Sequence, residues 1–203
     1  MGNRRRALCS LLACLLLGST TGVHVAAESE TPMQLVQRLV QAIIRTTPTH
    51  SALSAAEQAA NAALAKEANT ILDIPAVAQR TLGKHWQARL FAEQQAFIVL
   101  LEQLLTKVAY PKSAAFFHGL ETTVAQENIT GQRATVKTTV KHPKAGLVAV
   151  DYRLVQASSV WRVQDILLDD VSLAAHLQSQ FNKIITENSY AELLRRMHDK
   201  LNE

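Results

Sequence analysis

The stretch from Val160 to Phe181 constrains the fold most, because it joins a strand pattern to a helix pattern with almost no loop between them. Its first part, Val160–Leu168, is apolar and rich in β-branched residues, which is typical of a strand. After Asp169 and Asp170, Ser172 stands at a helix N-cap position, and apolar residues then recur at helical spacing. The sequence therefore predicts a strand that turns sharply into a helix packed against the same sheet.

Helical patterns dominate the chain before residue 120. Capping residues predict helices that begin after Thr31 and Ser54 and a short helix that Pro75 opens and Gly83 closes. A wide apolar face predicts a buried helix over Phe91–Tyr110. A further short helix is expected over residues 111–118.

Strand patterns follow, with a first strand expected over Glu121–Glu127 and a turn over Asn128–Gly131. Polar and apolar residues alternate over Arg133–Lys141, as in a half-buried antiparallel strand. The residues expected on the inward face here and in the next strand are Ala134, Val136, Thr138, Val140, Val148, Val150, Tyr152 and Leu154. The fold class predicted is α+β, with helices packed on a curved, mostly antiparallel sheet of about four strands. Such a sheet can enclose an apolar pocket, as the NTF2-like cone does.

Residues 1–27 have the organisation of a cleavable secretory signal. Three arginines precede the apolar run Ala7–Leu17, and small residues end the segment at Ala27. The apolar run is too short to span a bilayer. We predict cleavage after Ala27, export, and a single α+β domain over residues 28–203. A lipobox that ends at Cys14 is the less favoured alternative.

Removal of the signal changes the charge and the cysteine content. Without Arg4, Arg5 and Arg6 the 21 basic residues fall to 18 against 17 acidic ones, which leaves a net charge of about +1. This balance does not favour nucleic acid or an anionic membrane as a partner. Cys9 and Cys14 leave with the signal, so neither a disulfide nor a cysteine-based metal site is expected.

Motifs for catalysis or metal binding are absent from the sequence. It contains no H-x-x-x-H or H-E-x-x-H pair, no G-x-S-x-G elbow and no Walker loop. Ser172, His176 and Asp165 are compatible with a catalytic triad, but serines and aspartates are common enough that such a trio carries little weight. We therefore expect no catalytic residue, no metal and no cofactor.

Three aspartates near the end of the last long strand have two interpretations. Asp165, Asp169 and Asp170 are compatible with a cation site. The favoured interpretation makes Asp169 and Asp170 turn and cap residues. It places Asp165 on the same strand face as Trp161 and Val163, where it accepts hydrogen bonds from the backbone or a tryptophan N–H.

Two sequence blocks resemble one known family. The first is WRVQDILLDDVSL followed by Phe181, which is similar to the pattern W-K-V-x-D-v-x-i-e-G-V-S-L…F. The second is LG-x-x-W…F…LL…Y, from Leu82 to Tyr110. Both are typical of the MlaC family, also called the toluene-tolerance family, of periplasmic phospholipid-shuttle proteins. The matching residues are Trp161, Val163, Asp165, Val171, Ser172, Leu173 and Phe181, and Leu82, Gly83, Trp86, Phe97, Leu104, Leu105 and Tyr110.

The sequence also departs from the family pattern. Asp170 stands where the family usually has Gly, so we expect that this position does not need a positive φ. Leu177 and Gln178 replace the usual Tyr-Arg pair. Leu90 and Phe91 precede the long helix without the usual Ser or Thr cap, so its start is expected to fray.

The resemblance covers about residues 71–201 and implies a soluble periplasmic carrier without enzymatic activity. Similar proteins hold phospholipid, one or two molecules, by the acyl chains and touch membranes only transiently. They pass lipid between an outer-membrane lipoprotein–porin complex and the MCE-domain subunit of an inner-membrane ABC transporter, which maintains outer-membrane lipid asymmetry. The residues expected to bind lipid here are Trp86, Phe97, Leu101, Leu104, Leu105, Tyr110, Val136, Val140, Val148, Val150, Tyr152, Val163, Leu173 and Phe181.

Three other functions remain open from the sequence. A related branch of the family is associated with hopanoid-producing bacteria, so a hopanoid-type polycyclic lipid is an alternative cargo. A periplasmic adaptor of the same fold would have a filled core, and the apolar residues alone are equally well explained by ordinary core packing. An NTF2-like enzyme would need an acid or base in the pocket, and Asp165 is the only carboxylate expected to point inward.

Overall fold

The computed structural model describes residues 30–48, 53–144 and 146–203. The predicted signal peptide, its cleavage after Ala27 and the alternative lipobox at Cys14 lie outside these residues. No helix in the described ranges is long and apolar enough to cross a membrane.

The first two helices begin at the capping boxes that the sequence predicts. In α1 (Pro32–Ile44) the Thr31 hydroxyl accepts a hydrogen bond from the Gln34 N–H, and the Gln34 side chain accepts one from the Thr31 N–H. Ser54 caps α2 (Ala55–Ile71) in the same way. The alanines on the buried side of α2 let it pack closely against α1.

One continuous helical segment replaces the two separate helices expected around residue 110. It consists of α4 (Phe91–Leu104), a π-helical turn at Leu105–Ala109, and α5 (Tyr110–Phe117). Pro111 explains the π-turn, because its ring would clash with the carbonyl four residues earlier in a regular α-helix. The start of α4 lacks a side-chain cap, as expected, although the Glu93 carboxylate accepts a hydrogen bond from the Leu90 N–H.

The strands form one open antiparallel sheet in the order β1-β2-β3-β4-β5, which confirms the α+β class. Its strands are β1 (Glu121–Thr130), β2 (Arg133–His142), β3 (Gly146–Ala157), β4 (Val160–Leu168) and the short β5 (Val171–Ser172). The turn expected over Asn128–Gly131 was placed too early. Asn128 still pairs with Thr135, and the turn needs only Gly131, with φ 58°, and Gln132.

Two tight turns of the sheet place non-glycine residues at positive φ. Ser158 and Ser159 join β3 to β4, and Asp169 and Asp170 join β4 to β5. The φ of Asp170 is 67°, so the expectation that this position avoids positive φ was wrong. A two-residue hairpin turn of this kind requires positive φ at both central positions, and aspartate tolerates it better than most residues.

A β-bulge in β4 reverses the expected direction of Asp165. Arg153 pairs with Asp165 and its neighbour Leu154 pairs with Val163, so Gln164 is an extra residue in the ladder. Directly paired residues share a face and consecutive residues alternate. Asp165 therefore lies on the face opposite Val163, and the prediction that both share one face was wrong.

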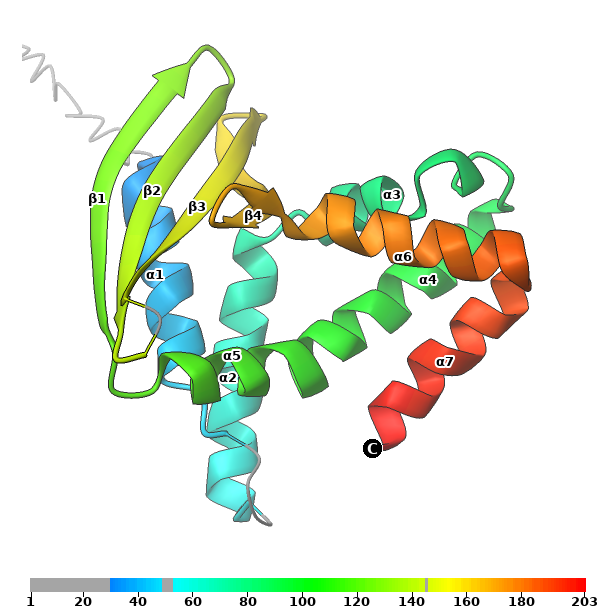
Figure 1. Ribbon diagram of the computed structural model, residues 1–203, viewed down its shortest axis with the longest axis horizontal. Helices are drawn as coiled ribbons and strands as arrows, with labels where there is room; N and C mark the ends of the chain where they lie inside the picture. The colour runs from blue at the N-terminus through cyan, green and yellow to red at the C-terminus, as the bar shows by residue number, and fades with distance from the viewer. Residues whose placement is uncertain (1–29, 49–52, 145) are drawn as a thin grey trace, which may run out of the picture.

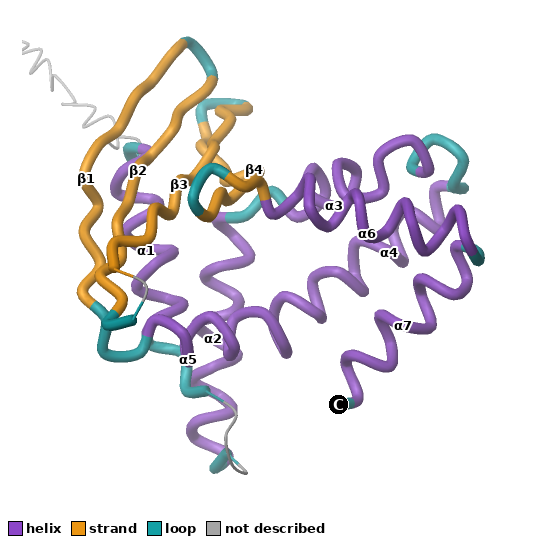
Figure 2. Tube along the Cα trace, viewed as in Figure 1, coloured by secondary structure: helices purple, strands orange, loops and turns teal. Residues whose placement is uncertain are grey.

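The elements group into two regions, seen side by side in Figure 1. The sheet region contains β1–β5 with α1, α2 and α5. The helical region contains α3 (Ile74–Leu82), α4, α6 (Leu173–Glu187) and α7 (Tyr190–Asn202), which contact one another. Figure 2 shows that all strands gather at one end of the molecule.

The two regions join at the stretch from Val160 to Phe181, in which the last long strand turns into α6. Ser172 caps α6 through the Ala175 N–H, as the sequence predicts. On the other side, Leu72 forms a parallel bridge to Val163 just before α3 begins. The core of the helical region is aromatic: the ring of Phe97, fully buried, lies 6.1 Å from that of Phe181 in an edge-on arrangement.

Candidate ligand-binding cavity

An apolar cavity of about 510 Å³ lies between the sheet, α1 and α5. This volume falls within the range of about 300–1,000 Å³ that is typical of small-molecule sites. The inner face of β2, β3 and β4 forms one wall with Val140, Val148, Val150, Tyr152 and Ile166. The alternation of polar and apolar residues in these strands is what directs these side chains to one side.

Helices form the opposite walls of the cavity. Helix α1 contributes Leu39, Val40, Ile43 and Ile44, and the end of the long helical segment contributes Leu105, Ala109, Tyr110, Phe116 and Phe117. The π-turn at Leu105–Ala109 lies in this wall.

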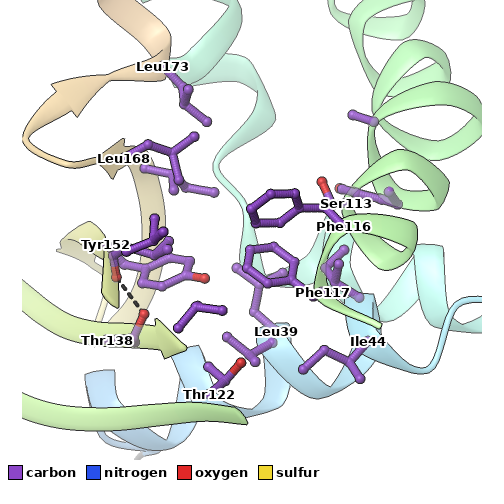
Figure 3. Close-up of a pocket in the computed structure, with 18 of the residues that line it drawn as sticks. Leu39, Ile44, Ser113, Phe116, Phe117, Thr122, Thr138, Tyr152, Leu168 and Leu173 are labelled. Carbon is purple, nitrogen blue, oxygen red and sulfur yellow. Dashed lines mark hydrogen bonds between the residues drawn. The ribbon is translucent and has the colours of Figure 1, made fainter. Parts of the chain in front are cut away.

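The cavity opens between α5 and the β4–β5 turn. Phe116 on α5 is 47% exposed and Leu168 on β4 is 37% exposed, although both line the cavity. Figure 3 shows the two residues on opposite sides of the space, with Ser113 beside Phe116. Lys112 and Asp169 also line this end, and they are the only charged residues among the described residues that line the cavity. The mouth is therefore polar at its edge and apolar immediately inside.

Three hydroxyl-bearing side chains on the strands line the cavity. Thr138 donates a hydrogen bond of 2.6 Å to the Val150 carbonyl. The Thr122 oxygen is buried and has no hydrogen-bond partner among the described residues. The Tyr152 ring projects from β3 into the cavity with its hydroxyl foremost (Figure 3).

Burial keeps the cavity's two tyrosines protonated. It raises the pKa of Tyr152 well above its ordinary value. Burial, with a smaller contribution from the nearby Glu102 carboxylate, raises the pKa of Tyr110 as well. The Tyr110 hydroxyl points out of the cavity and donates a hydrogen bond of 2.6 Å to Asn69 Oδ1. The Tyr152 hydroxyl makes no hydrogen bond within the described part of the chain, so it is a free donor.

Half of the residues expected to bind lipid come together in this cavity. Those that line it are Leu105, Tyr110, Val140, Val148, Val150, Tyr152 and Leu173. The others do not line it: Val136 and Val163 are fully covered on the inner face of the sheet, and Trp86, Phe97, Leu101, Leu104 and Phe181 pack in the helical region. Lipid contact remains a prediction for the first group, whereas the second group packs in the core.

Sequence reasoning missed the contribution of two helices. The apolar stripe of α1, including Leu39 and Ile43, was visible in the sequence but was interpreted only as a buried face. Phe116 and Phe117 lie in α5, which was expected as a short helix without an assigned role. A consecutive aromatic pair next to a helix-terminating glycine was the available signal, since two successive helical side chains are about 100° apart and together cover a wide face.

Asp165 does not face the cavity but joins the sheet to the helical region. Its side chain, 1% exposed, accepts hydrogen bonds from the Ser172 hydroxyl at 2.7 Å and the Ala174 N–H at 3.2 Å. Arg80 on α3 and Arg153 on β3 place guanidinium nitrogens 3.6 and 3.7 Å from its Oδ2. The predicted backbone hydrogen bond is confirmed, and the carboxylate is neutralised by two arginines.

This arrangement removes the structural basis of the enzyme hypotheses. Ser172 bonds directly to Asp165, whereas the His176 ring is hydrogen-bonded to Gln180, so the three residues do not form a triad. No group of three or more acidic, histidine or cysteine residues in the described ranges is placed to hold a metal ion. Asp169 acts as a turn residue, because its Oδ1 accepts a hydrogen bond from the Ala149 N–H.

The sheet and helices of this α+β fold enclose an apolar cavity with a polar mouth. These features define a protein that binds hydrophobic ligands. The family model described as "MlaC protein" matches residues 37–199, so the chain belongs to the MlaC family. This is a family of lipid-binding carriers and not of enzymes.

A solved structure with the same fold is described as the phospholipid-binding protein from Ralstonia solanacearum in complex with a phospholipid. It is similar to this chain with a TM-score of 0.67 and 18% sequence identity, over 84% of this chain and 96% of that one. None of the curated proteins compared with the chain matches it significantly.

Proposed function

We propose that this protein is a soluble periplasmic carrier that binds a phospholipid by its acyl chains and shuttles it between the outer and inner membranes. The observation that carries the proposal is the apolar cavity of about 510 Å³ with its polar mouth, in a chain of the MlaC family. The phospholipid complex of the Ralstonia solanacearum protein supports the same ligand class.

The energetics of acyl-chain burial support a carrier. Each buried methylene contributes about 0.8 kcal/mol, so ten methylenes contribute about 8 kcal/mol. A binding free energy of that size corresponds to a micromolar dissociation constant. The entropy lost when the lipid is ordered weakens the binding below that value. Lys112 and Asp169 leave the head group in a polar environment at the mouth.

The transport partners belong to the same proposal. The carrier receives or delivers lipid at an outer-membrane lipoprotein–porin complex and at the MCE-domain subunit of an inner-membrane ABC transporter, and so contributes to outer-membrane lipid asymmetry. The signal-like residues 1–27 support export to the compartment between those complexes. The exposed mouth supports direct transfer, because lipid that leaves beside Phe116 and Leu168 need not cross open water.

Native mass spectrometry tests the binding step. The protein is expressed with its signal, purified from periplasm without detergent, and its lipids are extracted and identified. We expect one bound phospholipid, and a hopanoid-type lipid in the extract would replace phospholipid as the cargo. A protein free of lipid that also takes none up from labelled liposomes would contradict the proposal and favour an adaptor.

A matched pair of charge substitutions locates the site. Leu105→Glu places a carboxylate in the cavity wall and should reduce lipid retention at least tenfold, because either the charge or the acyl chain must lose its preferred environment. Val99→Glu adds the same charge on α4 at a position 52% exposed and should retain lipid. Equal retention by both folded variants would place the lipid elsewhere.

A further inference from the structure

The Tyr152 hydroxyl is the feature of the cavity that an acyl-chain site alone does not explain. An apolar tail needs only apolar walls, and phenylalanine would fill the same space. Tyrosine hydroxyls in protein interiors usually find a hydrogen-bond partner. Tyr152 is 6% exposed and its hydroxyl makes no hydrogen bond within the described residues, but the oxygen is not fully enclosed, because it borders the cavity.

The position of Tyr152 along the cavity indicates which part of a ligand it meets. Val150 pairs with Leu168 at the mouth, and Tyr152 pairs with Ile166, one two-residue step further along the same strands. That step is about 7 Å in an antiparallel sheet. Lys112 and Asp169 line the mouth, and Figure 3 shows Tyr152 between Leu168 and the α1 side chain of Leu39.

This order corresponds to the chemical order of a glycerophospholipid. Its charged head group comes first, the two ester carbonyls follow, and the hydrocarbon tails come last. An ester carbonyl accepts hydrogen bonds and cannot donate them, whereas a protonated phenol supplies the complementary donor.

We infer that Tyr152 donates a hydrogen bond to an acyl ester carbonyl of the bound lipid, so that the cavity selects ester-linked over ether-linked glycerolipids. The inference rests on the proposed function, since it assumes a glycerolipid in this cavity with its head group at the mouth. It assigns to Tyr152 a role in lipid specificity that the apolar side chains of the cavity wall do not have.

The other tyrosine of the cavity provides an internal control. Tyr110 also lines the cavity and is equally buried, at 5% exposed, but its hydroxyl is already bonded to Asn69. Tyr110→Phe therefore removes the hydroxyl of another cavity-lining tyrosine without removing a free donor.

The test compares two lipids that differ only in the linkage, dipalmitoyl phosphatidylcholine and dihexadecyl phosphatidylcholine. Each competes with a pyrene-labelled phospholipid for the delipidated protein, and the ratio of their dissociation constants is measured. A hydrogen bond of ordinary strength predicts that the wild type binds the ester lipid about three- to tenfold more tightly. Tyr152→Phe should bring the ratio close to one through weaker binding of the ester lipid, and Tyr110→Phe should leave it unchanged.

The outcomes separate this inference from the proposed function. If the wild type binds both lipids equally, or if Tyr152→Phe keeps the preference, the inference is wrong while the carrier function stands. If the wild type binds neither lipid, the carrier function itself fails and the inference fails with it. The ratio of the two dissociation constants in the wild type decides by itself whether the cavity prefers the ester-linked lipid.

Discussion

The sheet region and the helical region use the same kinds of apolar residue but arrange them differently. In the helical region Phe97 meets the rings of Phe181 and Tyr190 at 6.1 and 6.5 Å, and side chains fill the centre. In the sheet region α1 contacts β1 and β2, yet a space remains between the sheet, α1 and α5, and this space is the cavity. The helical region therefore supplies stability, and the sheet region gives up packing contacts to hold a ligand.

Unpartnered buried polar atoms occur in both regions of the described chain. They are Thr122 Oγ1 in the sheet region, and Arg89 Nε and the Tyr190 hydroxyl in the helical region. An unpaired buried hydroxyl costs about 1–3 kcal/mol, and Thr122 differs from Tyr190 in lining the cavity, where a ligand can offset that cost. The four predictions below test this division, beginning with the largest expected effect.

Truncation of a phenylalanine should cost far more in the filled region than in the cavity wall. Phe97→Ala should lower the free energy of unfolding by about 4 kcal/mol, since the fully buried ring leaves a void among packed neighbours. Phe117→Ala should lower it by about half as much, because that ring already borders empty space. Urea denaturation measures both, and equal losses would contradict the division into a filled and an open region.

Removal of the carboxylate at the junction should have the next largest effect. Asp165→Ala leaves the Ser172 hydroxyl and the Ala174 N–H without their acceptor, and should destabilise the protein by about 2 kcal/mol. The side chains of Arg80 and Arg153 are exposed, so solvent screening makes their contribution to this stabilisation small. The control is Asp151→Ala on β3, a carboxylate without an ion pair among the described residues. Similar denaturation midpoints for both variants would show that the junction is unimportant.

Two threonine substitutions in the cavity lining should have opposite signs. Thr122→Val replaces an unpartnered buried hydroxyl with a methyl group and should stabilise the protein by about 1 kcal/mol. Thr138→Val removes a hydroxyl that donates to the Val150 carbonyl and should destabilise it by about the same amount. Thermal unfolding of the two variants compares them directly, and a loss in both would mean that the Thr122 hydroxyl has a partner in solution.

The smallest effect is expected at the β4–β5 turn. Asp170→Gly restores the residue usual in the family at a φ of 67° and should stabilise the protein by about 0.5 kcal/mol. Asp169→Gly should instead destabilise it, because the Asp169 side chain accepts a hydrogen bond from the Ala149 N–H. Differential scanning calorimetry resolves the two changes, and a lower melting temperature for Asp170→Gly would indicate that the turn favours aspartate at both positions.

Local features of this protein were accessible from the sequence because they depend on neighbours in the chain. Thr31, Ser54 and Ser172 each cap a helix where the spacing of apolar and capping residues predicts one. The alternation over β2 correctly assigns its buried side chains. The two sequence blocks identified the family, which the family model confirms.

Tertiary structure decided which buried residues face a cavity and which face other side chains. Phe97 and Tyr152 look alike in a hydrophobic pattern, which shows only that a side chain avoids water. One extra residue, Gln164, sends Asp165 to the opposite face of β4, and no period-two pattern can anticipate that insertion. The cavity is bounded by residues of α1, α5 and four strands that lie far apart in the chain, so only their assembly in three dimensions creates it.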